Sequence, residues 1–278
     1  MKKIIVIVTF LIGSSLLAQN VKYDQVDVYK KTETRDLNIS FVFPDNWKER
    51  TRWPMIVFYH GGGWAGGDIK QFSSQAAYFA GKGMVCALVE YRVAKVDHTD
   101  PFTALMDAKS AMRYLKKNSD RYRIDPNRIV AVGGSAGGHL AAAVDLVEGY
   151  NDPNDDLDIN TKVSGLVLFN PVIDNGPNGY GYERVGEAYK QFSPFHQDKS
   201  KMADVLIMVG TNDKHIPVQT MKDFCKDAKD AGSNCEVIFY KDATHGFFNK
   251  GKGDGHYYIE TRDEMEKFLR ARNFICEE

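Results

Sequence analysis

The feature that most constrains the fold is a sharp junction between a strand and a helix at residues 133–141, GGSAGGHLA. Residues 129–132, IVAV, are apolar and β-branched, as in a buried strand, and residues 139–149 have the composition of a helix. Ser135 therefore lies in a tight turn among four glycines. Glycine clusters at strand ends also serve as plain turns, so this motif alone does not distinguish a turn from a functional site.

The same alternation of apolar strands and helices continues along most of the chain. Two alternating segments, residues 23–32 and 35–44, come first, and further strands are expected at 53–59, 84–92, 164–172, 203–213 and 235–240. Helices are expected at 73–83, 101–122, 218–232 and 261–272. This order predicts an α/β fold with a mostly parallel central sheet, an antiparallel beginning and helices on both faces. The whole chain is 43% hydrophobic and 26% charged, which suits a single globular domain over residues 19–278.

The first eighteen residues differ from the rest. Two lysines follow Met1, an apolar run comes next, and small residues precede the polar segment that begins at Gln19. This pattern predicts a secretory signal peptide at residues 1–18 and a secreted or periplasmic protein without a stable membrane anchor. An uncleaved N-terminal anchor is the alternative. The formal net charge of −1 offers no general attraction for nucleic acid.

Four cysteines lie in the expected mature chain. Cys225 falls in a predicted helix and Cys235 begins the next strand, so a disulfide can join them if the strand runs back beside the helix. Cys86 lies within an apolar run and is expected to be buried. The spacings contain no zinc motif, and we expect no metal. The acidic residues 151–160 lack the glycine and distal glutamate of a helix-loop-helix calcium site, so a solvated connection is favoured.

Three side chains at predicted strand ends suit nucleophilic catalysis. A serine hydroxyl needs a general base to attack a carbonyl, and the base needs an acid that orients it. His245 follows the last strand, and Asp213 follows the strand before it. The order Ser135, Asp213, His245 is the one expected of α/β-hydrolases. Asp242, three residues before His245, is a weaker alternative for the acid.

The glycine-rich residues 60–64, HGGGW, follow the third predicted strand and suit an oxyanion hole. Glycines let backbone N–H groups approach a tetrahedral intermediate, and we assign this role to Gly62, Gly63 and Ala136, with His60 structural. Ala136 would also lie at a helix N-terminus, which favours negative charge. The rival interpretation, a phosphate-binding loop, lacks both of its sequence motifs.

With these four motifs the chain resembles the α/β-hydrolase esterases of the hormone-sensitive-lipase-like and acetyl or feruloyl esterase kind. HGGGW, GGSAGG, GTND and THGF match the family's oxyanion loop, nucleophile turn, acid loop and histidine loop, over about Tyr23 to Leu269. Gly134 departs from the many relatives that carry an acidic residue before the serine. Relatives with GGSAGGHLA are more like the branch of esterases associated with polysaccharides. The resemblance implies a carboxylic ester hydrolase without a cofactor.

The substrate is less well indicated. The signal peptide and the resemblance favour acetyl or other short acyl groups on polysaccharides or oligosaccharides. A small-molecule or lipid esterase, a peptidase of the prolyl-oligopeptidase type and a non-catalytic binding module are the alternatives. Trp64, Tyr180 and Tyr182 are weak candidates for substrate contacts, and residues 174–196 form either a cover over the site or a surface excursion. The sequence does not indicate an oligomeric state.

Overall fold

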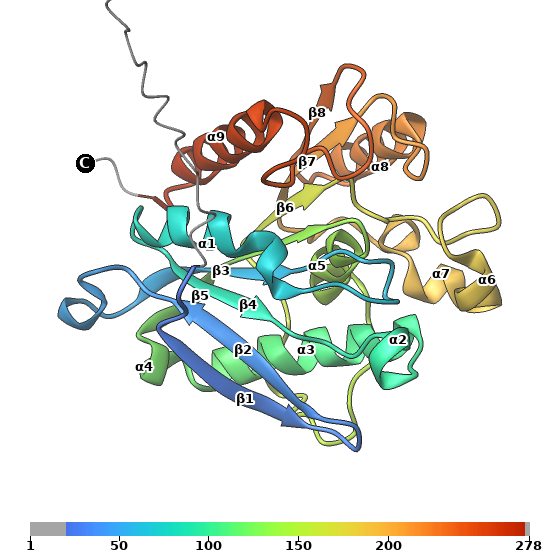
Figure 1. Cartoon of the computed structure of the whole chain (residues 1–278). Coiled ribbons are helices and arrows are strands. Elements are labelled where there is room, and N and C mark those ends of the chain that lie inside the picture. Colours follow the sequence, from blue (N-terminus) through green and yellow to red (C-terminus); the bar gives the residue numbers. More distant parts are fainter. Residues whose placement is uncertain (1–20, 276–278) are drawn as a thin grey trace, which may run out of the picture.

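A computed structural model of the chain describes residues 21–275. The predicted signal peptide, residues 1–18, lies outside the described residues. Eight strands form one sheet in the order β1-β2-β4-β3-β5-β6-β7-β8 (Figure 1). The strands are β1 (Gln25–Lys31), β2 (Asp36–Val42), β3 (Trp53–Tyr59), β4 (Val85–Val89), β5 (Ile124–Gly134), β6 (Gly165–Phe169), β7 (Asp204–Gly210) and β8 (Cys235–Tyr240).

The predicted mixture of antiparallel and parallel pairing is confirmed. β1 pairs with β2 and β2 with β4 in antiparallel fashion, whereas β4, β3, β5, β6, β7 and β8 are parallel neighbours. The central strands are continuous apolar runs because helices cover both of their faces. The carboxyl ends of the parallel strands therefore meet at one edge of the sheet, where ligands bind in folds of this kind.

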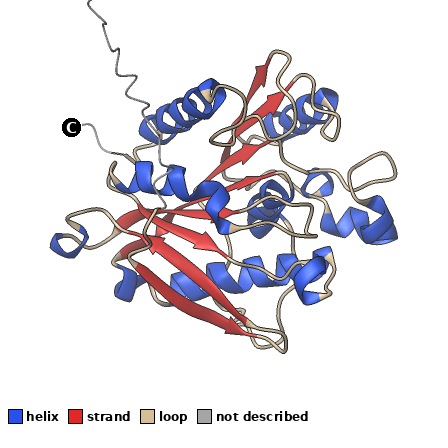
Figure 2. Ribbon diagram, viewed as in Figure 1, coloured by secondary structure: helices blue, strands red, loops and turns tan. Residues whose placement is uncertain are grey.

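Helices lie on both sides of the twisted sheet (Figure 2). The longer ones are α1 (Ser73–Ala80), α3 (Pro101–Lys117), α5 (Ala136–Leu146), α8 (Val218–Asp230) and α9 (His256–Ala271). Short α-helices are α2 (Ala94–Asp97), α4 (Ser119–Tyr122), α6 (Tyr182–Val185) and α7 (Tyr189–Phe192). Single 3₁₀ turns are η1 (Trp47–Glu49), η2 (Ile69–Phe72), η3 (Gly186–Ala188) and η4 (Pro194–His196).

Two hydrophobic clusters, one on each face of the sheet, form the core. Met55 and Val57 of β3 belong to the cluster under α3, α5 and α8, while Ile56 and Phe58 belong to the cluster under α1 and α9. This division follows from the period of two along a strand, which sends successive side chains to opposite faces. The fold is thus the predicted doubly covered α/β sheet.

Two helices differ most from the sequence prediction. The helix expected over residues 101–122 is divided into α3 and α4 at Asn118, whose φ of −102° and ψ of 23° are not helical. Helix α9 begins at His256, five residues before the predicted start at Thr261. The added first turn, His-Tyr-Tyr-Ile-Glu, contains residues of modest helix propensity that the sequence pattern does not favour.

A disulfide ties α8 to β8. Gly232 turns the chain at a φ of 92° after α8, and the returning strand places Cys235 with its Cα atom 5.2 Å from that of Cys225. The structure joins these two residues, whereas Cys86 is a free, buried thiol whose pKa burial raises. No helix within residues 21–275 is both long enough and apolar enough to span a bilayer.

Candidate active site

Ser135 lies in the turn that joins β5 to α5, with a φ of 54° and a ψ of −119°. This backbone conformation is strained for a residue with a side chain, and such strain concentrates at functional sites. The flanking glycines allow the turn because the backbone is crowded there: a Cβ atom on Gly137 would lie 2.1 Å from the carbonyl oxygen of Tyr59. The local sequence therefore folds into a narrow turn that presents the serine at the edge of the sheet.

A separate steric contact requires a glycine at position 134. A Cβ atom at this position would lie 2.5 Å from Cζ of Phe248. The Phe248 ring is fully buried and stacks on Phe169, with ring centres 4.5 Å apart. Any larger side chain before Ser135 must displace this ring.

The structure brings Ser135, His245 and Asp213 into one hydrogen-bonded row. His245 Nε2 lies 2.9 Å from Ser135 Oγ, and His245 Nδ1 lies 2.7 Å from Asp213 Oδ2. Asp213 follows β7 and His245 follows β8, so the parallel strands deliver both side chains to the same edge. Asp242, the alternative acid, is exposed at a φ of 58°, and His245 bonds Asp213 instead.

Asp213 is held as a carboxylate. Burial acts to raise its pKa, but the hydrogen bond from His245 and those from the backbone N–H groups of His215 and Ile216 outweigh burial, and the pKa lies below its ordinary value. The two backbone groups donate to Oδ1 at 2.8 Å and 3.1 Å, which leaves Oδ2 for the imidazole. An ionised acceptor at Nδ1 holds the proton on that nitrogen and leaves Nε2 free to accept one from the serine.

The backbone N–H groups of Gly62, Gly63 and Ala136 are available to a ligand. Within residues 21–275 none of the three donates a hydrogen bond to the protein. Gly62 and Gly63 adopt φ angles of 127° and 63°, and a Cβ atom on Gly62 would lie 2.1 Å from the carbonyl oxygen of Gly66. The carbonyl of Gly62 accepts bonds from the N–H groups of Ala65 and Gly66, which polarises the peptide that carries the Gly63 N–H.

Gly62 and Gly63 line a pocket of about 250 Å³ together with Ser135 and His245. Of the three aromatic residues predicted as substrate contacts, Tyr180 lines the pocket. Trp64 does not, because its side chain is buried at 1% exposure, edge-on to His139. Tyr182 also points elsewhere, since its hydroxyl donates to Glu187 at 2.5 Å. The predictions for Trp64 and Tyr182 are therefore corrected: the first belongs to the core and the second to the outer surface.

The other histidines near the site have different surroundings. His215 is exposed and lines the pocket, edge-on to the His245 ring at a centre distance of 5.0 Å. His139 is fully buried under the pocket, and burial lowers its pKa to about 3, so the ring is neutral. His60 is buried against Tyr91, with ring centres 4.2 Å apart, and burial likewise lowers its pKa. This placement agrees with a structural role for His60.

Residues 174–196 contribute Tyr180 to the wall of the pocket. They follow β6 and contain α6 and α7 (Figure 1). Arg184 donates from Nη1 to the carbonyl oxygen of Gly63, and its guanidinium lies over the rings of Trp64 and Tyr180, 5.2 Å and 5.4 Å from their centres. The segment is thus attached to the glycine-rich residues 60–64 beside the site.

Three amide side chains of the pocket were not anticipated from the sequence: Gln71, Asn170 and Asn249. Asn170 is fully buried at the end of β6, and its Oδ1 accepts a bond from the N–H of Gly246, next to His245. The sequence signal that could have indicated Asn170 and Asn249 was their position after predicted strands. Gln71 precedes a helix on another part of the chain, and only the fold brings it to the pocket.

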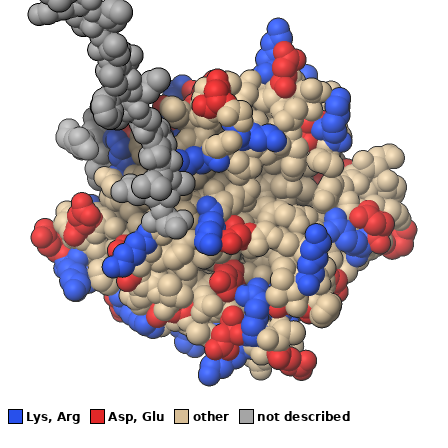
Figure 3. Space-filling view, in the orientation of Figure 1, with Lys and Arg blue, Asp and Glu red and all other residues tan. Residues whose placement is uncertain are grey.

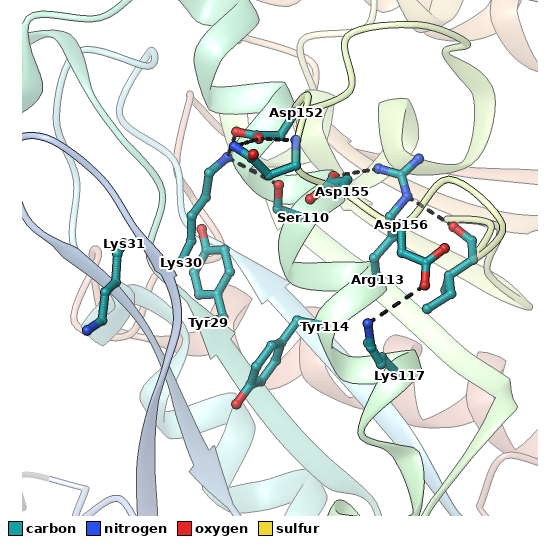
Figure 4. A pocket seen from close by; sticks show the side chains of 12 residues that line it. Tyr29, Lys30, Lys31, Ser110, Arg113, Tyr114, Lys117, Asp152, Asp155 and Asp156 are labelled. Carbon is teal, nitrogen blue, oxygen red and sulfur yellow. Dashed lines mark hydrogen bonds and ion pairs between the residues drawn. The ribbon is translucent and has the colours of Figure 1, made fainter.

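A larger hollow lies away from Ser135, between β1, α3 and residues 152–159 (Figure 4). Its volume is about 380 Å³, and several of its charged side chains pair with one another. Lys30 contacts Asp152 at 2.6 Å, and Arg113 contacts Asp155 at 2.8 Å. Asp152 and Asp155 of the 151–160 connection are therefore engaged with lysine and arginine. Lys30 also donates to Ser110 Oγ at 3.2 Å, so this lysine is held by both a carboxylate and a hydroxyl.

The surface charges are mixed. Lysine and arginine side chains alternate with aspartate and glutamate over the face in view (Figure 3). On this face neither sign forms a continuous field, which agrees with the net charge of −1. Within residues 21–275, histidine, cysteine and acidic side chains form no cluster of three that could hold a metal ion.

A parallel sheet covered on both faces, with a strained serine after β5 and a histidine after the last strand, defines the class of α/β-hydrolases. Comparison with known proteins agrees with this class. The BD-FAE family model matches residues 39–177, and the model of the dienelactone hydrolase family matches residues 179–273.

Solved structures and curated proteins give the same result. Esterase 2 of Thermogutta terrifontis in its apo form is 36% identical, with a TM-score of 0.89 over 93% of this chain and 98% of that chain. That esterase has also been solved phosphorylated by paraoxon and with propionate or butyrate bound. Esterase LipC of Mycobacterium tuberculosis is 27% identical over 218 residues, which are 70% of this chain and 53% of LipC.

An acetylxylan esterase of Xylanibacter ruminicola is 25% identical over 260 residues, which are 86% of this chain and 50% of that protein. The chain thus spans about half the length of these two curated relatives. The identity and coverage of the Thermogutta esterase are sufficient to assign the family. The chain belongs to the α/β-hydrolase esterases.

Proposed function

We propose that this protein is an exported serine esterase that removes acetyl or other short acyl groups from polysaccharides or oligosaccharides. The observation that carries the proposal is the row of hydrogen bonds from Ser135 Oγ through His245 to Asp213, at 2.9 Å and 2.7 Å. In an esterase family this row supplies a nucleophile, a general base and the acid that orients it.

In the first half of the proposed reaction, Ser135 Oγ attacks the ester carbonyl carbon while His245 Nε2 takes the hydroxyl proton. The carbonyl oxygen becomes an oxyanion, and the N–H groups of Gly62, Gly63 and Ala136 bind it. The bond between the carbonyl carbon and the alcohol oxygen then breaks. His245 gives its proton to that oxygen, so the alcohol leaves and the acyl group stays on Ser135.

In the second half, water attacks the acyl group as His245 takes a proton from it. Collapse of the second tetrahedral intermediate breaks the bond to Ser135 Oγ, and His245 returns the proton to that oxygen. The carboxylic acid leaves and the serine is restored. Throughout, Asp213 faces the imidazolium that forms twice in the cycle.

Short acyl groups are supported by the size of the pocket, about 250 Å³, and by the propionate and butyrate complexes of the Thermogutta esterase. A carbohydrate alcohol is supported by the acetylxylan esterase relative. Export is supported by the signal-peptide pattern of residues 1–18 and by the disulfide between Cys225 and Cys235, a bond that persists in oxidising compartments.

The test is hydrolysis of a 4-nitrophenyl ester series from acetate to decanoate, together with acetate release from acetylated xylan, by the wild type and by Ser135→Ala. We expect acetate or propionate to be preferred, acetate to be released from the polymer and Ser135→Ala to lose turnover of every substrate. A Ser135-dependent preference for long chains would instead indicate a lipid esterase. Unchanged turnover by folded Ser135→Ala would disprove the serine mechanism.

A further inference from the structure

A bridge of two amide side chains joins the oxyanion loop to the histidine loop. The N–H of Gly61 donates to Gln71 Oε1 at 2.6 Å, Gln71 Nε2 donates to Asn249 Oδ1 at 2.9 Å, and Asn249 Nδ2 donates to the carbonyl oxygen of Gly246 at 2.8 Å. Gln71 and Asn249 are 178 residues apart in the sequence. The bridge therefore connects loops from different parts of the sheet.

The two ends of the bridge determine how both amides point. A backbone N–H can only donate, so the oxygen of Gln71 must face Gly61; a carbonyl oxygen can only accept, so the nitrogen of Asn249 must face Gly246. Reversing either amide would place two donors or two acceptors against each other. All three bonds consequently run in one direction, and a chain of aligned bonds strengthens each of its members.

Both ends of the bridge adjoin groups of the proposed reaction. Gly61 precedes Gly62 and Gly63, and a Cβ atom on Gly61 would lie 2.9 Å from the carbonyl oxygen of Gly134. Gly246 follows His245 and has a φ of 76°, and its own N–H is held by Asn170 at 3.0 Å. A shift at either end would therefore move an oxyanion donor or the imidazole relative to Ser135.

We infer that Gln71 and Asn249 are positioning residues for the reaction, an inference that rests on the proposed serine mechanism. The bridge keeps the N–H groups of Gly62 and Gly63 and the Nε2 atom of His245 directed at one point above Ser135 Oγ. Oxyanion donors act only within a narrow range of about 2.7–3.1 Å from the oxyanion, and a displacement of about 1 Å costs on the order of 100-fold in rate.

The first test severs the bridge with side chains of similar size. Gln71→Met, Asn249→Leu and the double variant are compared with Gln219→Met, which removes an exposed amide bonded to Asp223 on α8. We expect each bridge variant to lower kcat for 4-nitrophenyl acetate about 10-fold to 100-fold with KM changed less than about threefold, because the oxyanion forms only in the transition state. The kcat of the double variant should be no lower than that of the less active single variant, because either substitution alone already breaks the bridge.

A second test uses pH. A carboxylate in Gln71→Glu still accepts from Gly61 but cannot donate to Asn249, whereas the protonated acid can do both. The ratio of variant to wild-type kcat should therefore rise at least threefold as the pH falls from 8 to 5, a change that a purely structural role would not produce.

Thermal melting followed by circular dichroism verifies that each variant is folded. Ser135→Ala is assayed beside these variants. Wild-type kcat in folded Gln71→Met and Asn249→Leu, or a ratio for Gln71→Glu that does not change with pH, would overturn the bridge while Ser135→Ala remains inactive. Turnover by Ser135→Ala would instead show that the serine mechanism itself had failed.

Discussion

Replacing Asp213 by asparagine tests the electrostatic reasoning most directly. Oδ1 of Asp213 accepts from two backbone N–H groups, those of His215 and Ile216. In Asp213→Asn the amide oxygen must take this place, because an NH₂ group there would face two donors. The amide nitrogen then faces His245 Nδ1, which must become an acceptor, so the proton moves to Nε2 and the ring can no longer take one from Ser135.

The expected loss of kcat in Asp213→Asn follows from the free-energy cost of reversing the amide of the new asparagine. Restoring the working tautomer breaks two hydrogen bonds in a site where the Asp213 side chain has 0% exposure. Leaving buried groups without partners costs about 1–3 kcal/mol each, so the reversal costs about 2–6 kcal/mol in total, or roughly 30-fold or more. Loss of the negative charge opposite the imidazolium adds to this, and we expect kcat to fall about 10³-fold to 10⁴-fold.

The assay is kcat for 4-nitrophenyl acetate between pH 6 and 9, and Asp242→Asn is the matched control. Asp242 is exposed at a φ of 58°, a conformation that asparagine tolerates, so its variant should fold and retain wild-type kcat. The reasoning would be refuted if folded Asp213→Asn kept kcat within tenfold of the wild type, or if Asp242→Asn lost as much activity.

Two further predictions concern stability. The disulfide between Cys225 and Cys235 closes a loop with a separation of 10 residues, so replacing both by alanine should lower the free energy of unfolding by about 2.7 kcal/mol in urea titrations under oxidising conditions; an unchanged midpoint would contradict this. His139 has a folded pKa of about 3, below the unfolded value of about 6.5, so the unfolded chain binds a proton first as the pH falls and stability is lost below 6.5. Between pH 7 and 5 this loss, measured by the same urea titrations, should be about 2 kcal/mol larger in the wild type than in His139→Gln.

Local steric and packing requirements allowed the sheet and the serine turn to be predicted from the sequence. The turn around Ser135 needs glycines because its backbone is crowded, and the apolar strands needed a doubly covered sheet because both of their faces are buried. Parallel strands end at one edge, so residues that follow strands, such as Asp213 and His245, could be expected to meet there.

Other features depended on distances that only the packed fold sets. Trp64 was expected at the substrate, but the segment around α6 covers it and leaves Tyr180 at the pocket wall. The choice between Asp213 and Asp242 as the partner of His245 required the hydrogen-bond geometry, since both lie close to strand ends.

The sequence offered no local signal for the bridge from Gln71 to Asn249 beyond the position of Asn249 after the last strand. An amide side chain acquires a direction only from the partners on its two sides, and those partners come from loops 178 residues apart. The sequence by itself thus determined the sheet, the serine turn and the order of the three polar residues, because these follow from periodicity and steric crowding. Tertiary packing alone decided which amides and aromatic rings reach the pocket, because that depends on contacts between distant segments.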